Sequence, residues 1–141
     1  MYKKFSFWLD VPPFVLAAVM GFVAVVLPPY LIPGGIKEKL EEPLFPFIAT
    51  ASANFAFFPS VLTLFFSGFV LGFIRPHLWW ALGLSTMLLF PLADLLETLV
   101  TPNSHNLWPF QLLLDFILSI PAILGAFMGK AFKNGGWREW F

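Results

Sequence analysis

The sequence predicts an all-α integral membrane protein, a four-helix transmembrane bundle in which residues 1–141 form a single transmembrane domain. The first observation is composition: 59% of the residues are hydrophobic and 11% are charged, whereas an ordinary soluble domain carries about 25% charge. A small soluble globule leaves much of its area exposed to water, so it could not hide this much apolar surface. The other observations are long uncharged segments and the turn-forming residues that separate them.

A helix that crosses the hydrocarbon core needs about 20 mostly apolar residues, each adding ~1.5 Å. We predict spans at 12–31, 57–74, 78–100 and 107–132. The uncharged stretch before the second span is longer than one helix requires. We therefore interpret residues 44–55 as an interfacial or re-entrant segment.

Turn-forming residues separate and end the predicted spans. They are Pro33-Gly34-Gly35, Arg75-Pro76-His77, the segment 101–106 and Asn134-Gly135-Gly136. Lys3 and Lys4 before an apolar run resemble the start of a signal peptide. That run is too long, however, and no small-x-small cleavage site follows it, so we interpret it as an uncleaved first span. Its prolines are compatible with a membrane helix, because neighbouring helices can satisfy the backbone groups that they free.

The distribution of basic residues predicts the orientation, since cytoplasmic loops carry an excess of Lys and Arg. Four spans put six basic residues on one side, and these are Lys3, Lys4, Arg75, Lys130, Lys133 and Arg138. Only Lys37 and Lys39 lie on the other side. We therefore expect both termini in the cytoplasm. Trp residues near the span ends fit the interfacial positions that this side chain prefers.

Small residues at helical spacing predict the packing faces, because close backbone approach drives helix association in lipid. Three stripes result: Ala17, Gly21, Ala24 and Pro28; Gly83, Thr86, Phe90, Asp94 and Glu97; and Gln111, Asp115, Ser119, Ala122, Ala126 and Gly129. Gly68 with Gly72 and Gly125 with Gly129 form small-xxx-small pairs. These pairs would join the second and fourth helices or form a contact between subunits.

Acidic residues within the predicted spans are the main candidates for a functional site. The rise per residue places Asp94 and Asp115 at similar depth in the outer leaflet, with Glu97 on the same helix face as Asp94. Gln111 lies one turn above Asp115, and His105 lies in the loop overhead. A charged carboxylate in hydrocarbon costs about 2.5–3.5 kcal/mol on insertion scales. No Lys or Arg in the outer half of a span offsets that cost.

Two interpretations of this acidic group remain open. The carboxyls either carry protons and share hydrogen bonds, or they bind a cation from outside, which includes a basic side chain of a partner. The structural alternative is that Asp94 and Asp115 only bond neighbouring hydroxyls or carbonyls freed by proline, while Glu97 is hydrated. His105 together with carboxylates could bind a hard or borderline cation, but the spacing does not identify a metal.

Other chemistry is not indicated by the sequence. No Ser-His-Asp arrangement and no phosphate-binding glycine loop is readable, so we predict no catalytic residue and no cofactor. The absence of cysteine excludes thiolate sites. The formal net charge is zero, so there is no basic excess to attract nucleic acid.

We expect a small multi-pass protein that serves as a non-catalytic subunit or oligomeric building block of a membrane complex. Its partners would be the lipid bilayer and other membrane subunits or copies of itself. The alternative is a cation- or proton-coupled transporter or channel that uses the acidic group. An intramembrane enzyme that acts on lipid ranks third, because paired aspartates can activate water but no basic phosphate site accompanies them.

Overall fold

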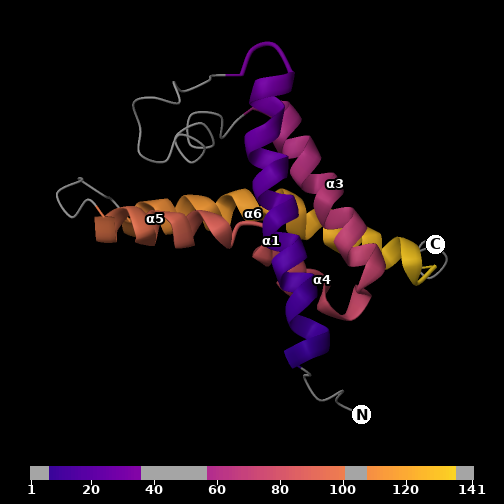
Figure 1. Ribbon diagram of the computed structural model, residues 1–141. Helices are drawn as coiled ribbons and strands as arrows, with labels where there is room; N and C mark the ends of the chain where they lie inside the picture. The colour runs from indigo at the N-terminus through magenta and orange to yellow at the C-terminus, as the bar shows by residue number, and fades with distance from the viewer. Residues whose placement is uncertain (1–6, 36–56, 101–107, 136–141) are drawn as a thin grey trace.

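A computed structural model describes residues 7–35, 57–100 and 108–135, and all the regular structure in these ranges is helical (Figure 1). The elements are α1 (Phe7–Leu31), α3 (Phe58–Ile74), the 3₁₀ turn η1 (Pro76–Leu78), α4 (Trp79–Ser85), α5 (Leu89–Val100) and α6 (Trp108–Lys133). The predicted interfacial or re-entrant segment 44–55 and the loop 101–106 lie outside the described residues.

Three of the four predicted helices agree closely with the structure. α3 and α6 match the segments 57–74 and 107–132 to within one residue, and α1 ends at Leu31 as expected but begins earlier. The prediction of one continuous helix over 78–100 is wrong. Residues 86–88 form a turn that divides this segment into α4 and α5.

Two helical segments are long and apolar enough to cross a membrane, namely Val11–Leu31 and Leu112–Lys133. α3 is also apolar but has only 17 residues. Every helix carries large hydrophobic side chains on its outer surface, such as Val15, Phe66 and Leu113, each more than half exposed. Two helices could therefore cross a membrane, which weakly suggests membrane association.

The helices meet at a crossing rather than in a row. α1 and α3 lie side by side, and α6 passes across them (Figure 1). α1 and α3 are antiparallel, because Ser60 contacts Val25 while the later residue Thr63 contacts the earlier Ala24. α3 and α6 run in the same direction, and α4 runs antiparallel to α6.

Prolines in α1 explain the polar contacts between α1 and α3. Pro28 and Pro29 have no amide hydrogen, so they free the carbonyls of Ala24 and Val25, four residues earlier. The hydroxyl of Thr63 donates to the Ala24 carbonyl at 2.6 Å, and that of Ser60 donates to the Val25 carbonyl at 3.1 Å. Neighbouring hydroxyls thus satisfy both freed carbonyls, as expected for proline in an apolar helix.

Glycine brings α3 and α6 into backbone contact. A Cβ atom added at Gly68 or Gly72 would overlap the carbonyl of Ala122 or Ala126, respectively. The contact is reciprocal, because a Cβ atom at Gly125 or Gly129 would overlap the carbonyl of Phe65 or Phe69. Both small-xxx-small pairs therefore lie at this helix–helix contact, which is the most extensive in the described chain.

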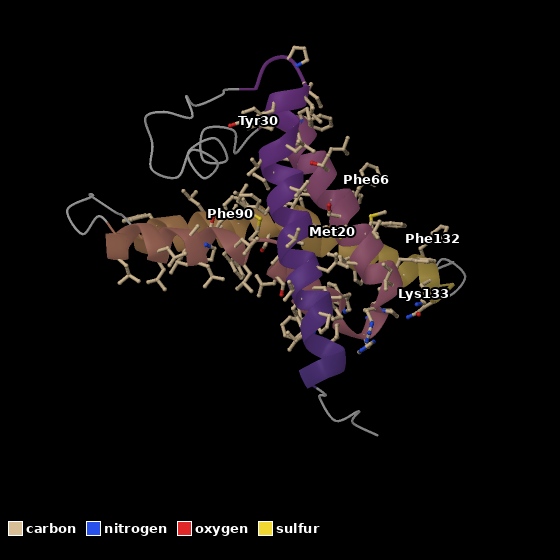
Figure 2. The ribbon with its side chains drawn as sticks, viewed as in Figure 1. Met20, Tyr30, Phe66, Phe90, Phe132 and Lys133 are labelled. Atoms are coloured by element: carbon tan, nitrogen blue, oxygen red, sulfur yellow. The ribbon has the colours of Figure 1, made fainter. Side chains whose placement is uncertain are left out.

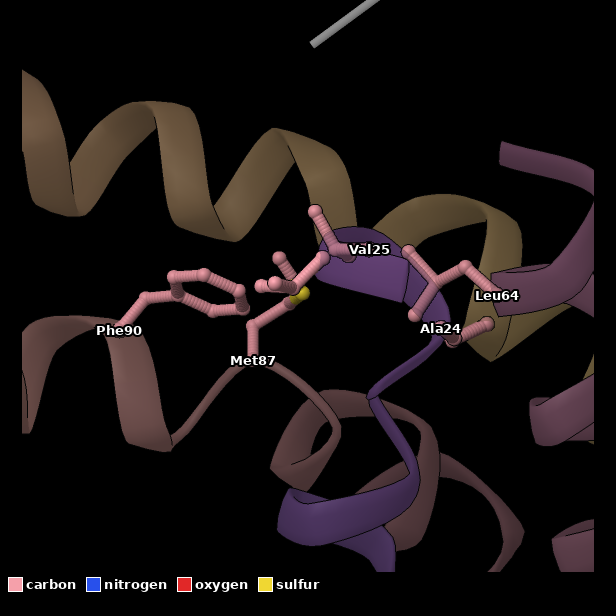
Figure 3. Close-up of a cluster of buried hydrophobic side chains, with 7 residues drawn as sticks. Ala24, Val25, Leu64, Met87 and Phe90 are labelled. Carbon is pink, nitrogen blue, oxygen red and sulfur yellow. The ribbon is translucent and has the colours of Figure 1, made fainter. Parts of the chain in front are cut away.

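The core lies where the helices cross. One cluster joins α1, α3, α6 and the turn before α5, with Met87 and Phe90 packed towards Val25 (Figure 3). A second cluster joins Ala17, Leu71 and Leu82 from α1, α3 and α4. In the three predicted stripes, every side chain that the structure describes is buried. The side chains of Asp94, Glu97 and Gln111 lie outside the described residues.

Candidate functional site

Asp115 is the buried acidic side chain among those that the structure describes. It lies in the first half of α6 and is 4% exposed. One turn later Ser119 is fully buried, and its hydroxyl donates to the Phe116 carbonyl within the helix at 2.6 Å. Helical spacing continues this buried face to Ala122 and Ala126. The carboxyl group therefore faces the interior of the helix assembly, on the same face as the small residues.

The surroundings of the two carboxylate oxygens of Asp115 differ. Oδ2 is buried and accepts no hydrogen bond from the part of the chain that the structure describes. Asp115 as a residue is engaged in an interaction with its surroundings. Asp115 is thus held inside the protein, on the packed face of α6.

The structure does not describe the side chains of the other residues predicted for the acidic site. Asp94 and Glu97 belong to α5, and Gln111 belongs to α6, but their side chains lie outside the described residues. His105 also lies outside them. The predicted grouping of these side chains around Asp115 therefore stays a prediction. Among the described residues, no three His, Asp or Glu side chains come close enough to hold a metal ion.

The turn between α4 and α5 is a second unusual feature of the structure. Its hydrogen bonds join residues three apart in the sequence. The Thr86 hydroxyl donates to the Gly83 carbonyl, and the Met87 amide donates to the Leu84 carbonyl. Thr86 is fully buried, and a Cβ atom added at Gly21 would overlap its backbone carbonyl. The broken helix is thus held tightly against α1. Gly21 is part of this contact.

Sequence reasoning missed this break, although signals were present. Pro91 cannot donate a hydrogen bond to the Met87 carbonyl, which weakens the helix there, and the Phe90 amide bonds that carbonyl instead at 3.2 Å. The hydroxyls of Ser85 and Thr86 donate to the carbonyls of Ala81 and Gly83 in α4, a pattern that often bends helices. The pairing of Ser60 and Thr63 with the proline-freed carbonyls was also missed. The spacing of the prolines identifies the freed carbonyls of Ala24 and Val25, but not the side chains that satisfy them.

Basic and aromatic side chains gather where α3 and α6 end. The Nζ atom of Lys133 donates to the Ile74 carbonyl at 3.1 Å and lies 5.7 Å from the centroid of the Phe73 ring. Figure 2 shows Lys133 and Phe132 at this end of α6. Lys130 lies 5.2 Å from the centroid of the Trp79 ring. Every Lys and Arg of the described ranges, Arg75 included, belongs to this end of the two helices.

The opposite half of α6 and all of α5 form a two-helix arm, which we define as Leu89–Val100 and residues 108–120. The arm extends away from α1 and α3 beyond the crossing (Figure 1). Its exposed apolar side chains are Leu92, Leu95, Leu96, Leu99, Phe110, Leu112, Leu113, Leu114, Phe116, Ile117 and Ile120. Beyond Phe90 on α5 and before Leu118 on α6, no described side chain belongs to either hydrophobic cluster.

Comparison of this chain with protein-family models, with curated proteins and with solved structures finds no match.

Proposed function

We propose that this chain is a multi-pass membrane protein that acts as a non-catalytic building block of a membrane assembly, with other subunits or further copies packed on its arm. The apolar outer surfaces of the helices support the membrane location, because such surfaces are costly in water. The lengths of α1 and α6, 25 and 26 residues, correspond to about 37–39 Å. This length exceeds the ~30 Å thickness of a hydrocarbon core. A helix longer than the core can fit within it by tilting.

The proposed topology has four crossings and places both termini in the cytoplasm, with α4 and α5 together forming the third crossing. The common position of Arg75, Lys130 and Lys133 at one end of α3 and α6 supports this orientation. Because the chain has no cysteine, single Cys residues can report each side. A Cys at Ser104 should react with an impermeant maleimide from outside, whereas a Cys at Arg138 should react only after the membrane is opened. The reverse pattern would contradict the orientation.

The arm is the observation that carries the proposal. It is built from two helices that contact each other modestly and leave most of their large side chains exposed. A neighbouring subunit on the arm would give the exposed faces of α5 and α6 a packing partner.

The experiment that tests this proposal is cross-linking from the arm in intact membranes. Single Cys residues at Leu95 and Leu113 sample α5 and α6, and a Cys at Val15 on α1 is the control, since all three positions are more than half exposed. We expect the arm positions, but not Val15, to give one adduct of defined mass that survives purification in mild detergent. A homogeneous monomer with no arm-specific adduct would contradict the proposal.

A second candidate function is cation- or proton-coupled transport, and one combination of observations favours it. A buried carboxyl on α6 accompanies a helix that is interrupted between α4 and α5. Intramembrane acids and interrupted helices are common features of ion pathways. Flux into liposomes should then be lost in Asp115→Asn and reduced in Asp94→Asn, with Asp10→Asn as the control. Flux that survives both changes would remove this candidate.

A further inference from the structure

A pocket of about 500 Å³ opens between the start of α1, the end of α3 and α4. Its volume lies within the range of about 300–1,000 Å³ that is usual for small-molecule sites. Pro12 and Leu16 of α1 and Ile74 of α3 are its exposed apolar lining, and the buried Leu71 and Leu82 complete it. Arg75 at the end of α3 provides the charged side chain of the lining. The pocket is therefore amphipathic, with an apolar interior and one guanidinium group.

Basic residues lie close to this end of α3 in the part of the chain that the structure describes. Lys133 donates to the carbonyl of Ile74, the residue directly before Arg75, and Lys130 lies against Trp79 of α4. Neither lysine lines the pocket itself. An ammonium group has three donors, and Lys133 is exposed, so its contact with Ile74 still leaves donors for another acceptor. The basic residues of the described ranges thus gather at the end of α3 and α6 that borders this pocket.

We propose that this pocket binds an anionic phospholipid, with the phosphate at Arg75 and one acyl chain along the exposed Pro12, Leu16 and Ile74. Arginine presents several donors in a planar fork that matches phosphate oxygens. The apolar walls distinguish a lipid from free phosphate, because only an acyl chain gains by covering them. The inference rests on the membrane location in the proposed function but not on the assembly through the arm.

The test measures lipids retained by the purified full-length chain in mild detergent, with phosphatidylglycerol and phosphatidylcholine of identical acyl chains as probes. Native mass spectrometry counts the bound lipids. We expect the wild type to prefer phosphatidylglycerol about tenfold, the scale set by a charge-assisted hydrogen bond. Arg75→Gln should abolish the preference, and Arg75→Lys should keep part of it. Lys37→Gln is the control for loss of a basic residue that the proposed topology puts on the other side.

A second variant tests the apolar half of the site independently of Arg75. Leu16 is half exposed, so Leu16→Trp should fill the pocket without disturbing the core and should reduce retention of both lipids. Val15→Trp is the matched control, since Val15 is the adjacent residue, is similarly exposed and does not line the pocket. Far-UV circular dichroism should show unchanged helix content in each variant.

Four other outcomes would contradict the lipid site or the membrane location on which it rests. Equal retention of the two lipids by the wild type, or a preference that survives Arg75→Gln, would overturn the inference. Binding of inorganic phosphate that Leu16→Trp leaves intact would identify a free-anion site and overturn the role of the acyl chain. Extraction of the protein from membranes by alkaline carbonate would instead refute the membrane location. An embedded protein without lipid preference would refute this inference alone.

Discussion

The two halves of α6 lie in different surroundings although they belong to one continuous helix. The second half carries Ala122, Gly125, Ala126 and Gly129, and it packs closely against α3 and α4. The first half carries mostly Leu, Ile and Phe, and it extends with α5 into the arm, where these side chains are exposed. Both halves are apolar, so apolar character does not decide which half packs. Small residues decide it, because they let backbones approach.

The largest expected effect comes from removing a small residue at the crossing. Gly125→Leu places a side chain against the carbonyl of Phe65, so we expect a loss of about 3 kcal/mol in the free energy of unfolding. Leu113→Ala in the arm of the same helix should cost less than about 0.5 kcal/mol, as is usual for exposed positions. Denaturation in detergent followed by circular dichroism measures both.

Equal losses of unfolding free energy in Gly125→Leu and Leu113→Ala would contradict the difference between the two halves of α6. They would mean that the arm is packed as tightly as the crossing. If cross-linked assemblies were isolated, Leu113→Ala would become the sharper probe, because the exposed arm side chains are the ones that the proposed partner covers.

An intermediate effect is expected at the proline-freed carbonyls between α1 and α3. Thr63→Val removes the donor to the Ala24 carbonyl and should cost about 0.6 kcal/mol, with ~1.7 kcal/mol as the upper end for such bonds between membrane helices. In a Pro28→Ala background the restored amide can bond Ala24 itself. The cost of Thr63→Val should therefore fall there, and a double-mutant cycle of unfolding free energies measures the difference.

Independence of the two changes in that cycle would show that the hydroxyl of Thr63 does not compensate for Pro28. Thr63 also contacts the carbonyls of Pro59 and Ser60 within its own helix. Additive costs would therefore assign its role to α3 alone, and the crossing would depend on small residues without help from hydrogen bonds.

The smallest expected effect is at the end of α6. Lys133→Gln weakens the contact with the Ile74 carbonyl and the Phe73 ring, and it should cost about 0.5 kcal/mol because cations near a helix C-terminus contribute this much. The cost should decrease at high salt. Lys37→Gln serves as the control, and an equal loss there would indicate a general charge effect rather than a contact between α3 and α6.

The helices that the sequence predicted well are those whose limits depend on local chemistry. Pro33-Gly34 follows α1, and Asn134-Gly135 follows α6. Gly34 and Gly135 adopt positive φ angles of 98° and 69°, a conformation that other residues rarely adopt. Long apolar runs between such turns define helices without any knowledge of their neighbours. The limits of α1, α3 and α6 could therefore be predicted.

The features that could not be predicted depend on contacts between helices. The break before α5 involves Pro91, but the turn is also held by the packing of Gly21 against Thr86, which no local pattern reveals. Burial of Asp115 could be predicted, because it shares a face with Ser119, Ala122 and Ala126. Its relation to Asp94 depends on how α5 lies on α6, and periodicity along one helix does not determine that.

The hydroxyl contacts of α1 have a consequence for biosynthesis in the proposed membrane setting. The bond from Ser60 to Val25 spans 35 residues and that from Thr63 to Ala24 spans 39 residues. When α1 leaves the ribosome, the segment that satisfies its two open carbonyls has not been synthesised. The first helix must therefore retain water or a chaperoning surface at Ala24 and Val25 until α3 arrives. Insertion of α1 and α3 as a pair removes that delay, so the hairpin rather than the single helix is the natural unit of insertion.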